Sequence, residues 1–163
     1  EGFASFTEWL WSEKHGDGAA KQLFRQYWSF YPRRDDMWKV QIGNPGPHNE
    51  FHYAVYDRGA MTLQALRTRI GDADFMTVMR QWAADHRYGN GEISEFIDLA
   101  QTVSGEDLGS FFDAWLYTAS RPQPTEANGF PAGFDPSASA RVAPPASWTK
   151  IQHTHRVLAG LER

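Results

Sequence analysis

Apolar residues recur at spacings of three and four along the first 117 residues, a pattern that predicts amphipathic helices. It predicts six of them, at about 2–14, 19–30, 53–70, from 72 to the turn at 87–91, 94–103, and from a capping sequence at 104–107 onward. Turns rich in Gly and Pro separate these segments. No alternating pattern predicts a strand, so the expected fold is an all-α bundle whose neighbouring helices are joined by short connections.

The composition changes after residue 117. Residues 119–147 hold six of the nine Pro residues together with several Gly, Ser and Ala, which is typical of a linker. Residues 148–163 have the length for one more short helix. We therefore divide the chain into a helical lobe, 1–118, and a Pro/Gly-rich tail, 119–163, and expect the tail to lie ordered against the lobe.

Composition and charge exclude several classes of protein. The 163 residues carry 16 Lys and Arg against 20 Asp and Glu, a net charge of −4, without the basic stripe of a nucleic-acid binder. No run of about 18 apolar residues predicts a transmembrane segment. The absence of Cys excludes disulfides, thiolate catalysis and Cys-ligated metal, and leaves a secreted and a cytoplasmic location equally open.

His48 and His52 have the i, i+4 spacing that places two imidazoles on one helix face for zinc. The zinc signature H-E-x-x-H needs Glu directly after the first His, whereas Glu50 is two residues away. Pro47 also places His48 at the mouth of a helix. We favour polar residues at a loop-to-helix junction over a metal site here. His153 and His155, at i, i+2, are expected at the surface.

Two short sequences, Glu1-Gly2-Phe3-Ala4 and Tyr56-Asp57-Arg58-Gly59, lie near the starts of the first and third predicted helices. Their order, their separation and their all-helical context resemble the catalytic domain of the aminopeptidase N-like zinc metallopeptidases, the gluzincin family that includes leukotriene hydrolase. In that family, the Glu of an N-E-G-F-A sequence is the third zinc ligand, and the Tyr of a Y-x-K-G sequence stabilises the tetrahedral intermediate. The resemblance covers about residues 1–122.

The resemblance implies that Glu1 is a zinc ligand and Tyr56 a catalytic hydrogen-bond donor, in an enzyme that hydrolyses peptides from their N-terminus. It implies zinc as the cofactor, and a fold that is the C-terminal lobe of a thermolysin-like catalytic domain. Elementary chemistry agrees with these roles. The positive end of a helix favours a carboxylate at its start, and a Tyr hydroxyl is a neutral donor suited to an oxyanion.

The sequence also departs from the family pattern. Arg58 stands where the family usually has Lys, and the chain contains no H-E dipeptide and no G-x-M-E-N segment. We therefore expect the chain to be one half of a catalytic domain, with the half that carries H-E-x-x-H as its partner. By itself it is expected to hold no stoichiometric zinc and to lack peptidase activity.

Two further expectations remain open. A non-catalytic helical interaction module, which keeps the fold without the chemistry, is the alternative to the enzyme. In addition, Phe3 and Phe6 would face the other half of the domain, so their apolar face is expected to be exposed or to form a dimer contact.

Overall fold

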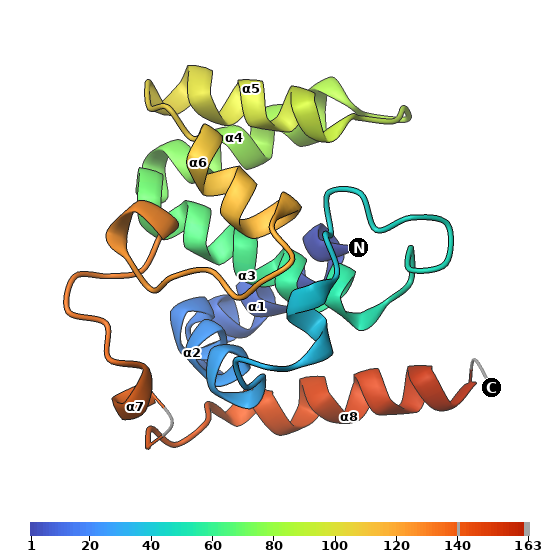
Figure 1. The fold of residues 1–163 in the computed structure, drawn as a ribbon, viewed down its shortest axis with the longest axis vertical. Coiled ribbons are helices and arrows are strands. Elements are labelled where there is room, and N and C mark those ends of the chain that lie inside the picture. The colour runs from blue at the N-terminus through green and yellow to red at the C-terminus, as the bar shows by residue number, and fades with distance from the viewer. Residues whose placement is uncertain (140, 162–163) are drawn as a thin grey trace.

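The computed structural model describes residues 1–139 and 141–161, and these form a helical structure (Figure 1). Its longer helices are α1 (Gly2–His15), α2 (Ala20–Phe30), α3 (Tyr53–Ile70), α4 (Asp72–Asp85), α5 (Ile93–Ser104) and α8 (Ala146–Leu161). Its short ones are η1 (Asp36–Lys39), α6 (Gly109–Phe112), the π-helical turn η2 (Asp113–Tyr117), η3 (Glu126–Asn128) and α7 (Pro136–Ser139). No strand occurs among the described residues, which confirms the all-α prediction. None of their helices combines the length and hydropathy of a membrane span.

The last helix of the lobe differs from its prediction. Instead of starting a helix, Gly105 ends α5 in the left-handed conformation. The carboxylate of Asp107 then accepts a hydrogen bond from the N–H of Gly109, the first residue of α6, at 2.9 Å. Residues 105–107 therefore belong to the connection between α5 and α6, and α6 passes directly into η2 after four residues.

Helices α1 and α3 lie side by side and run in the same direction through the middle of the molecule (Figure 1). At one end Gly2 meets Gly59, and at the other the carboxylate of Glu13 accepts a hydrogen bond from Arg67 at 2.8 Å. The first contact is between backbones. A Cβ added to Gly59 would lie 2.7 Å from the Cα of Gly2, closer than side-chain atoms come to a backbone. Both positions therefore require glycine.

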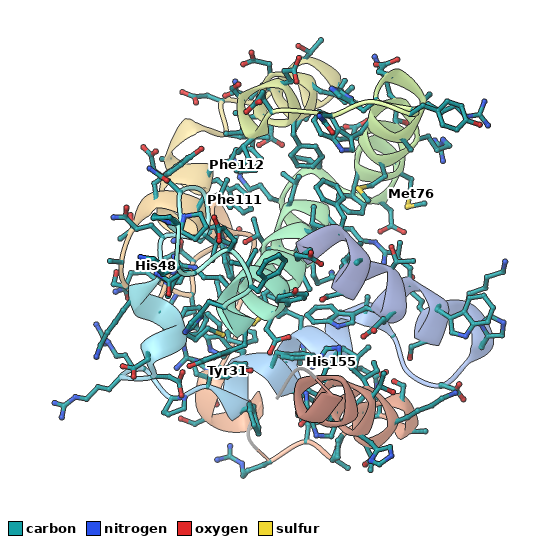
Figure 2. The ribbon with its side chains drawn as sticks, turned by 90° about the vertical axis from the view of Figure 1, so that its right-hand side faces the viewer. Tyr31, His48, Met76, Phe111, Phe112 and His155 are labelled. Carbon is teal, nitrogen blue, oxygen red and sulfur yellow. The ribbon has the colours of Figure 1, made fainter. Side chains whose placement is uncertain are left out.

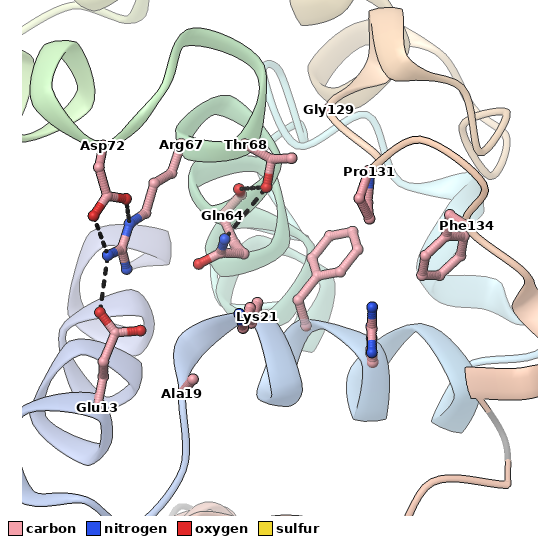
Figure 3. A pocket seen from close by; sticks show the side chains of 12 residues that line it. Glu13, Ala19, Lys21, Gln64, Arg67, Thr68, Asp72, Gly129, Pro131 and Phe134 are labelled. Atoms are coloured by element: carbon pink, nitrogen blue, oxygen red, sulfur yellow. Dashed lines mark hydrogen bonds and ion pairs between the residues drawn. The ribbon is translucent and has the colours of Figure 1, made fainter.

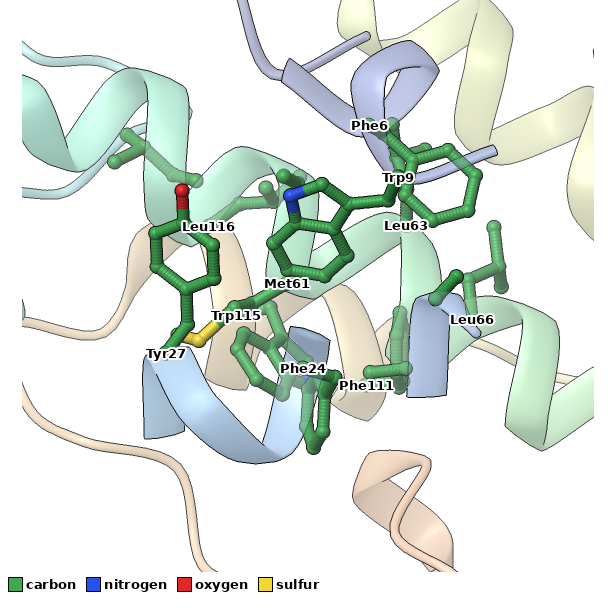
Figure 4. Close-up of a cluster of buried hydrophobic side chains, with 14 of the residues drawn as sticks. Phe6, Trp9, Phe24, Tyr27, Met61, Leu63, Leu66, Phe111, Trp115 and Leu116 are labelled. Atoms are coloured by element: carbon green, nitrogen blue, oxygen red, sulfur yellow. The ribbon is translucent and has the colours of Figure 1, made fainter. Parts of the chain in front are cut away.

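Aromatic side chains fill the space between α1, α2, α3 and the α6–η2 segment (Figure 4). Trp9 stacks on Tyr27 with ring centroids 5.0 Å apart, and Phe24 lies 6.2 Å from Trp115. Such rings bury large apolar areas and add specific ring–ring contacts. Residues of the apolar stripes such as Leu23, Leu66 and Phe75 are buried, whereas Phe30 is 56% exposed where α2 ends.

The expectation that Phe3 and Phe6 form an exposed face is wrong. Phe6 is fully buried and packs edge-on against Phe75 of α4, while Phe3 packs against Phe96 of α5 with ring centroids 5.1 Å apart. This face lies beneath α4 and α5, at the top of Figure 1. Helices of the same chain therefore cover most of this apolar face.

The tail packs against the lobe. Phe130 is buried among the core aromatics, although the composition of 119–147 is that of a linker. Helix α8 crosses α2, where Trp148 contacts the ring of Tyr27 edge-on at 4.9 Å. The hydroxyl of Ser147 lies 2.7 Å from that of Ser12 on α1. In the part of the tail that the structure describes, α8 is the last helix, and it packs against α1 and α2.

The close approach of α1 and α3 predicts an unusual outcome for Gly59→Ala. In a helix interior this change ordinarily stabilises by about 1 kcal/mol. Here we expect it to destabilise the chain by about 1–3 kcal/mol, because the methyl group must push α1 away. Urea denaturation monitored by circular dichroism measures the effect. Gly89→Ala is the control, since its nearest neighbour would be an ordinary 3.8 Å away; a stabilised Gly59→Ala chain would contradict the packing.

Candidate functional site

The two sequence segments singled out above meet at one end of the molecule. The contact between Gly2 and Gly59 sets Glu1 beside the first turns of α3, and Tyr56 lies one turn before Gly59 on that helix. Residues three apart on a helix share a face. Because α1 and α3 are parallel, the positive ends of both helix dipoles lie at this same end.

Glu1 is the N-cap residue of α1, and its backbone carbonyl accepts a hydrogen bond from the N–H of Ser5 at 3.1 Å. Its side chain is exposed and makes no capping hydrogen bond. The carboxylate is therefore placed at a helix start, where the dipole favours an anion, without being engaged by the helix itself.

Tyr56 is half-buried in the first turns of α3. Just before it, Phe51 is 75% exposed and Tyr53 is 41% exposed, so aromatic surface surrounds the start of this helix. The hydroxyl of Tyr53 donates to Asp35 at 2.9 Å. Both rings are thus accessible to solvent at the start of α3.

Next to Tyr56, Asp57 belongs to a buried polar cluster that the sequence patterns did not reveal. Asp57 is 5% exposed and accepts a hydrogen bond from the hydroxyl of Tyr31. The ring of His155 on α8 lies 4.0 Å from Asp57 and 3.0 Å from the carboxylate of Glu8 on α1. Figure 2 shows Tyr31 and His155 where α8 meets the lobe.

His155 was expected at the surface, and that prediction is wrong. Its ring is half-buried between Glu8 and Asp57, whereas His153 is exposed as expected. Sequence periodicity could not reveal the cluster, because its members come from three helices and from the residue that follows α2, all far apart in the chain.

Burial shifts the pKa values in this cluster. Desolvation raises the pKa of Asp57 to about 6, against the lowering effects of the Tyr31 hydrogen bond and the His155 charge. The hydrogen bond to Glu8 raises the pKa of His155 above its usual value. Both groups therefore bind a proton more tightly in the folded chain than in the unfolded chain.

Arg58 is fully buried and anchors the start of α3 to two distant segments. Its guanidinium donates to the carbonyls of Trp38 and Val40, and to those of Ala114 and Thr118, at 2.8–3.2 Å. No carboxylate pairs with it among the described residues, and burial lowers its pKa to about 10. A guanidinium can donate along both edges of its plane, whereas the ammonium of Lys has three donors at one point.

His48 and His52 lie in and at the end of the loop that precedes α3. His52 is the N-cap residue of α3, and its Nδ1 accepts the N–H of Ala54 at 3.1 Å. His48 is exposed in the preceding loop, away from His155 (Figure 2). The favoured interpretation, a loop-to-helix junction, is confirmed. Among residues 1–139 and 141–161 no group of three His, Cys, Asp or Glu side chains could hold a metal ion.

The similarity of this chain to known proteins includes the two segments that contain Glu1 and Tyr56. The model of the peptidase family M1 domain matches residues 1–115. Aminopeptidase N of Streptomyces lividans is 28% identical over 116 residues, which are 68% of this chain and 14% of that protein. Tricorn protease-interacting factor F2 of Thermoplasma volcanium is 30% identical over 85 residues, which are 52% of this chain and 11% of that protein.

A more distant relative is the probable M1 family aminopeptidase 1 of Encephalitozoon cuniculi, 22% identical over 132 residues, or 75% of this chain and 15% of that protein. The chain thus spans 11–15% of the length of these three relatives. No solved structure matches it.

The buried cluster predicts a pH dependence of stability. The raised pKa values mean that Asp57 and His155 stabilise the folded chain when protonated, and that this contribution is lost as the pH rises. For Asp57 the loss falls between about pH 4, its unfolded pKa, and pH 6, and amounts to roughly 3 kcal/mol at most. Asp57→Asn keeps an acceptor for Tyr31 but does not ionise.

We therefore expect Asp57→Asn to gain stability relative to the original chain as the pH is raised from 4 to 7. Urea denaturation at several pH values measures this difference. Asp98→Asn, an exposed substitution on α5, should show no such trend. A constant difference between Asp57→Asn and the original chain over this range would rule out the assigned titration.

Proposed function

Because the chain belongs to the peptidase family M1, we propose that it is the helical C-terminal lobe of the catalytic domain of a zinc aminopeptidase. The observation that supports this most directly is the contact between Gly2 and Gly59. It explains why both segments of the resemblance contain glycine, and it gathers Glu1 and Tyr56 at one end of two parallel helices. The proposed substrate is a peptide, cleaved from its N-terminus.

In this proposal Glu1 is one of three protein ligands of zinc. Its exposed carboxylate, free of helix capping, fits that role. Two further donors must come from another segment, since the described residues do not supply them. The proposed source is an H-E-x-x-H helix in the other half of the domain, which is then the partner of this lobe. Zinc in such a site supplies Lewis-acid polarisation of the peptide carbonyl and an activated water.

Tyr56 is proposed to donate a hydrogen bond to the carbonyl oxygen as negative charge develops on it. A donor held in place before the reaction stabilises the transition state more than the flat amide of the substrate. Two features hold the start of α3 in place. Arg58 binds it to the carbonyls of two loops, and His52 caps its first turn.

Tyr56→Phe tests the catalytic assignment in a protein that contains both this lobe and the H-E-x-x-H helix. We expect kcat to fall roughly 10²–10³-fold, with little change in KM, because the contact is made in the transition state. Tyr53→Phe, three residues before Tyr56, is the matched control, since it removes a hydroxyl that donates to Asp35. Steady-state kinetics with a peptide substrate separates the two; a kcat for Tyr56→Phe within a few-fold of the original refutes the assignment.

Glu1→Gln tests the metal ligand in the same protein. An amide oxygen is neutral and a poorer zinc ligand than a carboxylate, and even loss of an outer-sphere partner weakens metal binding 10–100-fold. We expect zinc affinity to fall at least tenfold, as measured by competition with a chelator, while the exposed substitution Glu50→Gln leaves it unchanged. Unaltered zinc affinity in Glu1→Gln would refute the ligand. Absence of both zinc and peptidase activity in the unsubstituted protein would favour the non-catalytic helical module.

A further inference from the structure

A cavity of about 500 Å³ lies at the other end of α1 and α3 (Figure 3). Glu13 and Arg67 lie on its wall. Glu13 comes eleven residues after Gly2 on α1, and Arg67 comes eleven residues after Tyr56 on α3. At 1.5 Å per residue, roughly 16 Å of helix separates the two ends. The cavity is therefore distinct from the candidate functional site, and its volume is typical of small-molecule sites.

The wall formed by the tail is built on one close contact. Gly129 has a left-handed backbone, and a Cβ at this position would lie 2.1 Å from the carbonyl oxygen of Ala65 on α3. Only glycine allows the segment to approach α3 this closely. Pro131 and Phe134 follow, and together with Phe24 of α2 they give the cavity an apolar part of its lining.

Of the three basic side chains that line the cavity, one forms ion pairs with the carboxylates there and two do not. Arg67 donates to Asp72 at 2.6 Å and to Glu13 at 2.8 Å, so it neutralises much of the charge of both carboxylates. Lys21 and Arg25, one turn apart on α2, also line the cavity. Within residues 1–139 and 141–161 neither forms an ion pair. The α2 side of the cavity is thus suited to an anion.

Gln64 supplies an unused acceptor. Its side chain is 6% exposed, and its amide nitrogen donates to the hydroxyl of Thr68 at 3.4 Å. Its Oε1 has no hydrogen-bond partner among the described residues, and Figure 3 shows this oxygen directed into the space above α2. A buried acceptor without a partner carries a free-energy cost that a ligand N–H would remove.

We propose that this cavity binds a small carboxylate that carries an apolar side group and an N–H donor. The carboxylate pairs with Lys21 and Arg25, the apolar group packs among Phe24 and Phe134, and the N–H donates to Gln64. This chemistry is shared by a free N-acylated aromatic amino acid and by the C-terminal residue of a peptide. The site is independent of the proposed peptidase function.

Isothermal titration of this chain with N-acetyl-L-phenylalanine tests the proposal. We expect saturable binding with one site per chain. N-acetyl-L-phenylalaninamide lacks the charge and 3-phenylpropionate lacks the N–H, so both should bind at least tenfold more weakly. A tetrapeptide that ends in Phe distinguishes the sources, because it binds at least as tightly only if the cavity accepts a peptide C-terminus. Equal affinity for all three small probes would overturn the proposal.

Variants localise the site. Arg25→Gln and Gln64→Leu should each weaken binding of N-acetyl-L-phenylalanine at least tenfold, and Arg80→Gln, exposed on α4, should not. Arg25 lies at the surface edge of α2, so its substitution keeps the test valid if Gln64→Leu fails to fold. Absence of saturable binding to the original chain, or unchanged affinity in Arg25→Gln, would show that the cavity is not a carboxylate site.

Discussion

The approach of the backbones of α1 and α3 is the constraint on which the rest of this structure depends. Parallel helices cannot be joined by a short turn, so the chain between them forms α2 and the long loop that contains η1. The contact between Gly2 and Gly59 brings the segments that contain Glu1 and Tyr56 to the same end of the two helices. The ion pair between Glu13 and Arg67 holds the other end, where the cavity forms. These two contacts fix the position of α1 relative to α3 at both ends.

A second constraint is the burial of Arg58 without a carboxylate partner among the described residues. A buried cation is costly unless its donors form hydrogen bonds. Here Nη1 and Nη2 of Arg58 donate to the four backbone carbonyls named above. The carbonyls of Ala114 and Thr118 lie at the end of η2, where a helix leaves carbonyls without internal partners. One side chain thus completes a helix terminus and fixes a loop. This gives a structural reason for Arg58 in place of the Lys of a Y-x-K-G sequence.

The sequence predicted the helices well where burial follows a simple period. Phe6, Trp9 and Leu66 lie on apolar stripes, and all three are buried. It failed where burial depends on partners far away in the chain. Asp57 is contacted by Tyr31, which follows α2, and by His155 of α8, and no local pattern carries that information. The two glycines that carry the resemblance were visible in the sequence, but the reason for them, a contact between helices 57 residues apart, was not.

The position of α8 also determines when the surface of α1 is completed as the chain is made. Ser12 meets Ser147 across 135 residues, and Glu8 meets His155 across 147. Contacts of such separation form late, since chain closure must precede them. During synthesis from the N-terminus, the lobe can assemble around its aromatic core before α8 exists. Ser12 and Glu8 on α1 therefore stay in contact with water until residues 147–155 have been synthesised.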